Sequence, residues 1–167
     1  MLCTITCRAI ASILAFLVGC AVFEIARPTD ELRLPEPKSQ ILSISMQRRG
    51  CSDAEQKCPV FDVTFRSDGT CEFIGYANDE FIGKYEGEYN LEDFAYLADQ
   101  VNKQGFFELP LEMPEGPLEE TVAVEVITTN SAKRLTTQNW AGTPSGLRAL
   151  QAVIEQQTYE VEWEEHP

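Results

Sequence analysis

Hydrophobic and polar residues alternate along several short stretches of the chain, and a period of two is typical of strands with one buried face. The hydrophobic positions of the first two stretches are Leu42, Ile44 and Met46, and then Phe61, Val63 and Phe65. Further alternation covers residues 70–76, 81–89, 122–126 and 133–138, and residues 159–163 show it again. We therefore expect six strands and a last strand over 159–163.

Two other segments repeat hydrophobic residues every three or four positions, which is typical of a helix with one buried side. Asn90 is the expected N-cap of the first helix and Gly105 its C-terminal stop. Thr143 is the expected N-cap of the second helix, with Pro144 at the first helical position. The hydrophobic stripes are Leu91, Phe94, Leu97, Ala98 and Val101 in the first helix, and Leu147, Leu150 and Ile154 in the second. Both helices should bury one side.

Tight turns join the predicted strands. Residues 67–69 (Ser-Asp-Gly) are typical of a hairpin turn, and residues 78–80 and 129–131 have similar composition. Residues 106–120 contain several prolines and are expected to form an acidic loop. The helices are inserted between groups of strands and do not follow each strand. This order predicts an α+β fold, mainly an antiparallel sheet with two helices packed on one face.

The beginning of the sequence has the composition of an export signal. Arg8 precedes an apolar stretch over residues 9–23, which is short for a membrane span of ~20 apolar residues. Residues 17–20 (Leu-Val-Gly-Cys) resemble the bacterial lipobox, whose cysteine is lipidated and becomes the new N-terminus. We expect Cys20 to carry a lipid anchor. An ordinary signal peptide and an uncleaved anchor are the alternatives.

These features divide the chain into four parts. Residues 1–19 are the expected signal peptide, and residues 20–40 are a lipid-anchored tether whose prolines favour an extended chain. Residues 41–163 are expected to form a single domain, followed by a tail over residues 164–167. The expected location is the cell envelope, outside the cytoplasm, with the lipid holding the protein to a membrane.

Charge narrows the classes of partner. The chain has 13 basic and 27 acidic residues and a formal net charge of −14. Nucleic acids and anionic lipid surfaces bind clusters of Lys and Arg, so we expect neither nucleic-acid binding nor electrostatic binding to such lipids. The one histidine, His166, stands near the end of the sequence. A Ser-His or Cys-His pair and a histidine-rich zinc site are therefore not expected.

The cysteines left in the exported part are Cys51, Cys58 and Cys71. In an oxidising compartment we expect Cys51 and Cys58 to form a disulfide across a short polar loop. Cys71 alternates with hydrophobic strand positions, which favours a buried, inert thiol. Pairing of Cys58 with Cys71 stays open, as do a redox-active pair and a zinc site with Cys71 as third ligand.

Carboxylates are the most abundant source of chemistry, but no pair of them stands out. Two acids on facing strands could perform general acid and base catalysis, and calcium is the metal that suits such a surface. A solvated charged face is the preferred interpretation, because the acids stand in polar context. Residues 83–87 (Gly-Lys-Tyr-Glu-Gly) alternate like a strand and are not taken as a phosphate loop. We predict no catalytic residues, no metal and no cofactor.

Part of the sequence resembles a known family. The residues concerned are Arg49-Gly50-Cys51, Cys58 to Val63, Asp68-Gly69-Thr70, Gly75, and the region from Gly83 to Phe107. They are similar to an uncharacterised bacterial family, the domain of unknown function 6438, although the loop between the cysteines is longer and Phe61 replaces the usual tyrosine. The resemblance implies a small exported or lipid-anchored domain and brings no activity with it.

Aromatic residues are the remaining candidates for a binding surface, because Tyr and Trp are enriched where proteins bind partners. Trp140, Tyr85 and Tyr89 are the expected partner-binding residues, and the alternative is that they are half-buried residues of the sheet. We therefore expect a lipid-anchored domain, not an enzyme, that binds another protein of the cell envelope. A small envelope enzyme or a ligand carrier using surface carboxylates is the alternative function.

Overall fold

The computed structural model describes residues 39–50, 58–113, 120–138 and 142–166. These residues form seven strands and two helices. The strands are β1 (Ile41–Arg49), β2 (Val60–Arg66), β3 (Thr70–Ala77), β4 (Gly83–Glu88), β5 (Thr121–Thr128), β6 (Ala132–Thr137) and β7 (Trp163–Glu165), and the helices are α1 (Leu91–Lys103) and α2 (Ser145–Glu160).

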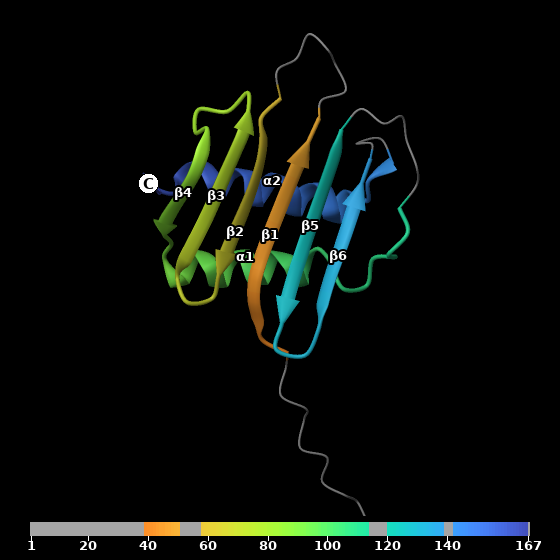
Figure 1. Ribbon diagram of the computed structural model, residues 1–167. Helices are drawn as coiled ribbons and strands as arrows, with labels where there is room; N and C mark the ends of the chain where they lie inside the picture. The colour runs from red at the N-terminus through yellow and green to blue at the C-terminus, as the bar shows by residue number, and fades with distance from the viewer. Residues whose placement is uncertain (1–38, 51–57, 114–119, 139–141, 167) are drawn as a thin grey trace, which may run out of the picture. The chain divides into compact units, whose positions relative to one another are not determined.

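The strands form one antiparallel sheet in the order β6-β5-β1-β2-β3-β4-β7. Both helices lie on the same face of this sheet and cross its strands obliquely (Figure 1). The strands β1 to β4 follow one another as neighbours, and short turns join β2 to β3 and β3 to β4. The predicted α+β class, with two helices on one face of a mainly antiparallel sheet, is confirmed.

The lengths of the helices suit the distances that they bridge. Helix α1 leads from β4 to β5, which lie four strand spacings apart in the sheet, a distance of roughly 19 Å. Its 13 residues span about 20 Å at 1.5 Å per residue. Helix α2 leads from β6 at one edge to β7 at the other, and it is longer, with 16 residues. The helices therefore return the chain across the sheet while covering its apolar face.

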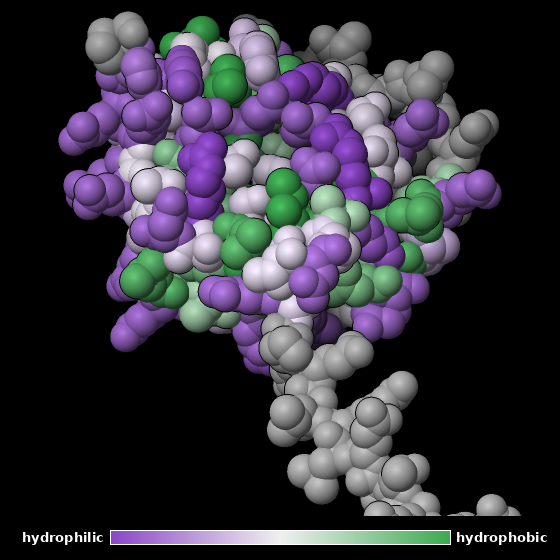
Figure 2. All heavy atoms as spheres, turned by 60° about the horizontal axis from the view of Figure 1, so that its bottom comes forward, coloured by the Kyte–Doolittle hydropathy of each residue, from purple (hydrophilic) through white to green (hydrophobic). Residues whose placement is uncertain are grey.

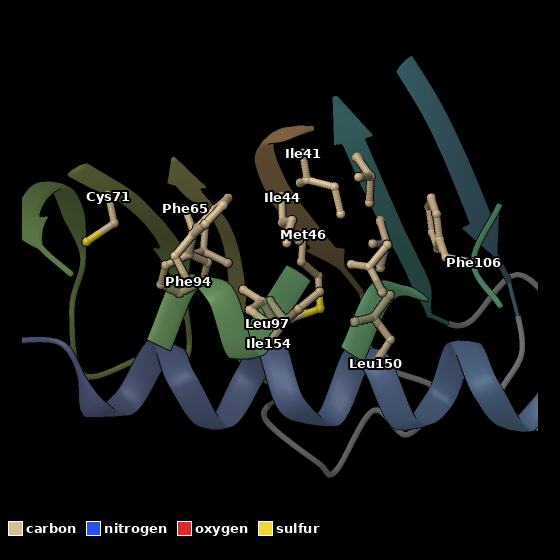
Figure 3. Packing of buried hydrophobic residues seen from close by; sticks show 14 of the residues in the cluster. Ile41, Ile44, Met46, Phe65, Cys71, Phe94, Leu97, Phe106, Leu150 and Ile154 are labelled. Atoms are coloured by element: carbon tan, nitrogen blue, oxygen red, sulfur yellow. The ribbon is translucent and has the colours of Figure 1, made fainter. Parts of the chain in front are cut away.

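The core lies between this face and the two helices. Side chains from the sheet point toward Phe94 and Leu97 of α1 and toward Leu150 and Ile154 of α2 (Figure 3). The inward positions of β2 are Phe61, Val63 and Phe65, and those of β5 are Val122, Val124 and Val126, all of them buried. Since these positions are those that the alternation predicts, the period-two pattern identified the buried face of both strands correctly.

The ends of α1 also agree with the sequence. The side chain of Asn90 accepts a hydrogen bond from the backbone N–H of Glu92. Gly105 has a φ of 64° just after the helix, a left-handed conformation that glycine adopts without strain. Helix α2 differs from the prediction, because it begins at Ser145 with Pro144 as its N-cap. Pro144 is extended, with a ψ of 139°, so the cap lies one residue after Thr143.

Two further strand predictions need correction. The register of the pairing between β1 and β5 shifts between Ile41 and Ser43. The side chain of Leu42 therefore does not point into the core and is 39% exposed, whereas Ile41 is buried. A bulge of this kind reverses the face on which a residue lies and leaves no signal in a hydrophobic alternation. The expected strand over 159–163 is the second correction. Helix α2 continues through Tyr159 to Glu160, and β7 begins only at Trp163.

The surface of the domain is mostly hydrophilic. In Figure 2 polar side chains cover most of the visible face, and hydrophobic ones are scattered among them. The large hydrophobic residues that the described part of the chain exposes are Leu42, Tyr76, Ile82, Leu91, Tyr96, Leu111, Ile127 and Tyr159. They come from both helices, several strands and two loops.

The backbone of Phe81 lies close to Gly75 of β3, and this close approach gives a test of the fold. A Cβ atom at Gly75 would lie 1.7 Å from the carbonyl oxygen of Phe81, which is backbone and cannot turn aside. We expect Gly75→Ala to lower the free energy of unfolding by about 1–3 kcal/mol, the range for overpacked cores. Urea denaturation followed by circular dichroism measures this. Ala95→Ser on the exposed side of α1 is the control, and equal stability of the two variants would contradict the packing of β3.

Candidate functional site

The aromatic residues expected to bind a partner do not form one exposed group. Tyr85 is half-buried on β4, and its hydroxyl donates to the carbonyl oxygen of Ile82. Tyr89 is only 8% exposed; its ring packs on Phe65 with centroids 4.7 Å apart, so it belongs to the core. Trp140 lies outside the described residues. Of these two tyrosines, Tyr85 alone keeps a partly exposed side chain.

The predicted lipid and disulfide sites lie mostly outside the described residues. Cys20 and Cys51 belong to the parts that the structure leaves out, so lipidation and the Cys51–Cys58 disulfide stay predictions. Cys58 is half-buried just before β2. Cys71 on β3 is a free cysteine and is 2% exposed. Burial raises the pKa of its thiol to about 11, which keeps it protonated and unreactive near neutral pH.

A groove of about 800 Å³ lies at the β4 and β7 side of the sheet. Six elements build it: the end of β2, the start of β3, the end of β4, the N-terminus of α1, the C-terminus of α2, and β7. It arises because β7 has three residues and pairs with Tyr85, Glu86 and Gly87 only. The end of β4 beyond Gly87 therefore has no β7 residue opposite it, and the two helix ends flank this part of the edge.

The floor of the groove is tightly packed. Cys71, Gly87, Tyr89 and Val161 all line it. A Cβ atom at Gly87 would lie 2.7 Å from Cγ1 of Val161 and 3.1 Å from Sγ of Cys71, so glycine allows the chain after α2 to cross β4 closely. The Tyr89 hydroxyl donates to Oε1 of Gln157 over 2.6 Å, which joins the end of β4 to α2. Burial raises the pKa of the Tyr89 phenol.

Negative charge dominates the walls. The acidic residues that line the groove are Glu72, Glu86, Glu88, Asp93, Glu160, Glu162 and Glu164, and we call this feature the acidic groove. Arg66 is the one basic residue among its lining residues. Clefts lined by charges of one sign raise the local concentration of the opposite charge. The acidic groove is therefore suited to cationic groups.

Three of these carboxylates stand directly beside one another across the strands. Glu72 of β3 is opposite Glu86 of β4, and Glu86 is opposite Glu164 of β7. Lys84 partly neutralises this row, with Nζ 3.1 Å from Glu72 and 3.5 Å from Glu86. The hydrogen bond to Glu72 is the main cause of the raised pKa of Lys84. His166 Nε2 lies 3.4 Å from Glu86 on the other side.

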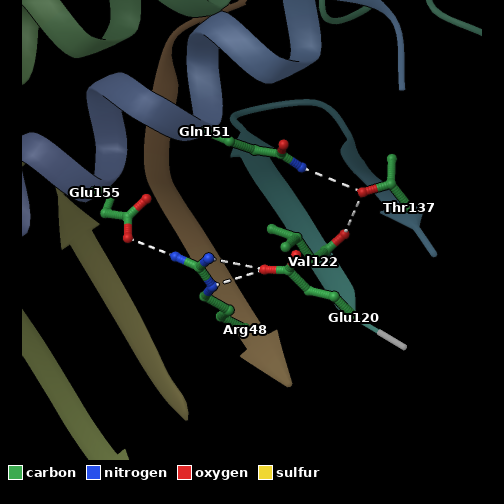
Figure 4. A network of polar contacts seen from close by, with 6 residues as sticks. All are labelled: Arg48, Glu120, Val122, Thr137, Gln151 and Glu155. Atoms are coloured by element: carbon green, nitrogen blue, oxygen red, sulfur yellow. Dashed lines mark hydrogen bonds and ion pairs between the residues drawn. The ribbon is translucent and has the colours of Figure 1, made fainter. Parts of the chain in front are cut away.

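A second polar cluster lies on the helix face of the sheet (Figure 4). The Arg48 guanidinium donates from Nε to Glu120 over 2.9 Å and from Nη1 to Glu155 over 2.5 Å. Gln151 donates to Thr137, whose hydroxyl donates to the carbonyl oxygen of Val122. The Arg48 and Glu120 side chains are 13% and 8% exposed. Each ionised group has a partner, so this cluster ties α2 to β1 and β5 and leaves no group to act on a substrate.

The third polar cluster is on the face of the sheet opposite the helices. The Arg49 guanidinium lies 4.7 Å above the centre of the Tyr76 ring, and Nη2 is 2.6 Å from Asp62. The Tyr76 hydroxyl donates to Asp62 over 3.0 Å. Half of Tyr76 is exposed, so this group is a small surface contact and does not enclose a ligand.

The described residues contain neither a cluster of metal-ligating side chains nor a membrane-spanning helix. Among the described residues, no three side chains of His, Cys, Asp or Glu are grouped so that they could hold a metal ion. The carboxylates of the acidic groove are thus neighbours, but no three of them surround a position where a metal ion could bind. Within the same residues, no helix has the length and apolar composition needed to cross a bilayer.

Comparison with protein families finds a match over most of the described residues. The model of a family described as a domain of unknown function (DUF6438) matches residues 42–158. The chain belongs to this family. The match runs from β1 to near the end of α2, so the DUF6438 region supplies most of the sheet and both helices, whereas β7 follows it. A search of curated proteins finds no match to the chain.

The acidic groove was not identified from the sequence of this DUF6438 domain. Its carboxylates come from four separate segments, and only the strand register places Glu72, Glu86 and Glu164 in one row. The alternation of β4 did indicate that Glu86 and Glu88 point away from the core. The sequence carried no signal for the short pairing of β7, which leaves the groove open.

The Arg48 cluster generates a prediction. Arg48→Met would leave the nearly buried Glu120 without a partner, and breaking such a pair is expected to lower the free energy of unfolding by about 3 kcal/mol. Urea denaturation at neutral pH measures the change. The exposed Arg134, which donates to Gln47, provides the matched variant Arg134→Met, with an expected change of about 0.5 kcal/mol or less.

A double variant completes this test. Adding Glu120→Gln to Arg48→Met removes the uncompensated charge, so part of the lost stability should return. If Arg48→Met is no less stable than Arg134→Met, the cluster does not hold α2 to the sheet.

Proposed function

We propose that this chain is an exported, lipid-anchored protein whose DUF6438 domain binds an extended basic segment of another cell-envelope protein in the acidic groove. The observation that carries this proposal is the composition of the groove, with the seven carboxylates named above against Arg66. The domain acts by binding, and it takes no cofactor.

The strand geometry supports an extended peptide as the bound segment. Glu86 and Glu88 are two residues apart on β4, and Glu162 and Glu164 are two apart beside them. Positions two apart on a strand repeat every ~6.6 Å. An extended segment with Lys or Arg at alternate positions has the same repeat, so its cations can meet successive carboxylates.

Electrostatics supports a protein partner whose affinity and rate of association depend on salt. Opposite charge across an interface steers encounter and sets the register of the bound segment. The carboxylates are mainly on the surface, where each ion pair contributes little, so specificity requires several of them together. Tyr85, which is half-buried on the same strand, places an aromatic ring next to this edge.

The alternative, an enzyme or ligand carrier that uses carboxylates, has less support. General acid catalysis requires a carboxyl group held in an apolar setting. Among the described residues Glu120 is the one buried carboxylate, and it is paired with Arg48 outside the groove. The acids of the groove are held in a polar, open setting that favours binding.

The anchor is supported by the sequence alone. Residues 17–20 end in Cys20 with the pattern of a lipobox, after one basic residue and an apolar stretch. The proline-containing segment that follows would separate the domain from the bilayer. An export route would also place Cys51 and Cys58 where disulfides form.

Binding in the acidic groove can be tested with a cationic peptide. The probe is a fluorescent eight-residue peptide of alternating Lys and Ser, and its anisotropy is measured with the full-length chain in neutral detergent. The variant Glu88→Gln/Glu160→Gln/Glu162→Gln removes three groove charges. We expect its affinity to fall about ten-fold at low salt, where charges separated by up to ~30 Å still interact.

The matched control removes three charges elsewhere, because any protein with a net charge of −14 attracts a basic peptide. Glu108→Gln/Glu112→Gln/Glu125→Gln changes residues that do not line the groove. Its affinity should fall about two-fold or less, the effect of net charge alone. Equal losses in the two triple variants would show that the peptide does not bind in the groove.

The anchor has a separate test. Cys20→Ala removes the only lipid acceptor in the motif, so the protein should appear in the soluble fraction after cell lysis, measured by fractionation and immunoblotting. Cys7→Ala, which changes a cysteine expected to leave with the signal peptide, should not alter the membrane fraction. Retention of the Cys20→Ala protein in membranes would rule out this lipid anchor.

A further inference from the structure

The segment after α2, residues 161–166, crosses the outer edge of β4, and we call it the strap. Besides the antiparallel pairing of β7 with β4, four contacts hold it. Val161 packs on Gly87, and the Trp163 ring packs on Phe73 with centroids 5.4 Å apart. The Trp163 indole N–H donates to the carbonyl oxygen of Thr158 over 2.9 Å. At the far end, the backbone N–H of His166 donates to Lys84.

Charge works against these contacts. Glu164 of the strap is directly opposite Glu86, which is itself opposite Glu72. Glu162 and Glu88 come next on the two chains after the Gly87 and Trp163 pair, and both line the acidic groove. Like charges directly opposite each other destabilise strand pairing. The strap therefore brings its carboxylates against those of the sheet each time it closes.

Basic side chains are few on this edge. Lys84 lies between Glu72 and Glu86, and His166 lies 3.4 Å from Glu86. Arg66 is the basic residue at the groove. These groups are exposed or half-buried, so their effect is screened by salt, as is the repulsion between the carboxylates. Negative charges outnumber positive ones on this edge. Screening of their repulsion by salt should therefore favour contact between the strap and β4.

We infer that the strap is a salt-dependent gate over the edge of β4. At low ionic strength, repulsion raises the fraction of molecules in which residues 161–166 have left β4. Screening cations close it. Opening removes Glu162 and Glu164 from the acidic groove, exposes the backbone of β4 to another strand, and uncovers Cys71.

Cys71 is a suitable reporter of this motion. It is the free cysteine among the described residues, it is 2% exposed, and its Sγ lies beside Gly87 under Val161. In the closed state a reagent cannot reach the thiol. Opening of the strap exposes it without unfolding of the sheet, so its alkylation rate follows the open fraction.

The experiment measures alkylation of Cys71 by N-ethylmaleimide, which is uncharged, in the full-length chain in neutral detergent. Peptide mass mapping separates Cys71 from the other cysteines. We expect the rate at constant pH to fall about five-fold when NaCl rises from about 10 mM to about 300 mM, because the screening length shortens from ~30 Å to less than ~10 Å. Screening of nearby carboxylates would lower the pKa of an open thiol and speed its reaction, so slower alkylation reports closure.

Two substitutions act in opposite directions. Glu164→Gln removes the charge opposite Glu86, and it should slow alkylation about three-fold at low salt and reduce the salt dependence. Glu112→Gln, an equal charge change outside the groove, should leave the rate unchanged. Gly87→Ala places a Cβ 2.7 Å from Val161, so it should raise the strap and speed alkylation at every salt concentration.

Hydrogen exchange separates this gate from global unfolding. Peptides covering 161–166 should exchange more slowly at high salt, whereas peptides from β2 should not change. If neither alkylation nor strap exchange depends on salt, or if the strap and β2 change in parallel, the strap is not a charge-controlled gate. No basic peptide is used, so this result is independent of whether the acidic groove binds a protein segment.

Discussion

Burial of a single face of the sheet is the constraint on which the remaining features depend. Two helices cover that face, and each returns the chain from one side of the sheet to the other. The hydrophobic positions of every long strand must therefore point the same way, and the charged positions collect on the other face and at the edges. A chain with 27 acidic residues must place many of them on this limited surface.

This constraint explains where the sequence was informative. Phe61, Val63 and Phe65 were identified as buried because strand pairing has a strict period of two. Asn90 was identified as a cap because its side-chain chemistry acts locally. Leu42 was misplaced, since a bulge changes the phase without changing the composition. The aromatic ring of Tyr89 continues the inward phase of β4, so it is a core residue and not a surface contact.

The candidate site was less predictable, because it depends on contacts between distant segments. Glu72, Glu86 and Glu164 come together through the register of β3, β4 and β7, and no pattern within one segment specifies that register. The family match does not indicate this site either, since it ends at residue 158 and β7 begins only at Trp163. Composition alone indicated a solvated acidic surface, but it could not place a group of carboxylates at one edge of the sheet.

The acidic groove and the strap have the same physical origin. Carboxylates beside β4 attract cations, and the same carboxylates repel the strap that carries Glu162 and Glu164. A basic segment seated in the groove would neutralise both sets of charges, so it would close the strap as salt does. Bulk salt, in contrast, weakens the attraction of the segment itself. Binding and closure should therefore be coupled through charge, with no need for a separate pathway between two distant sites.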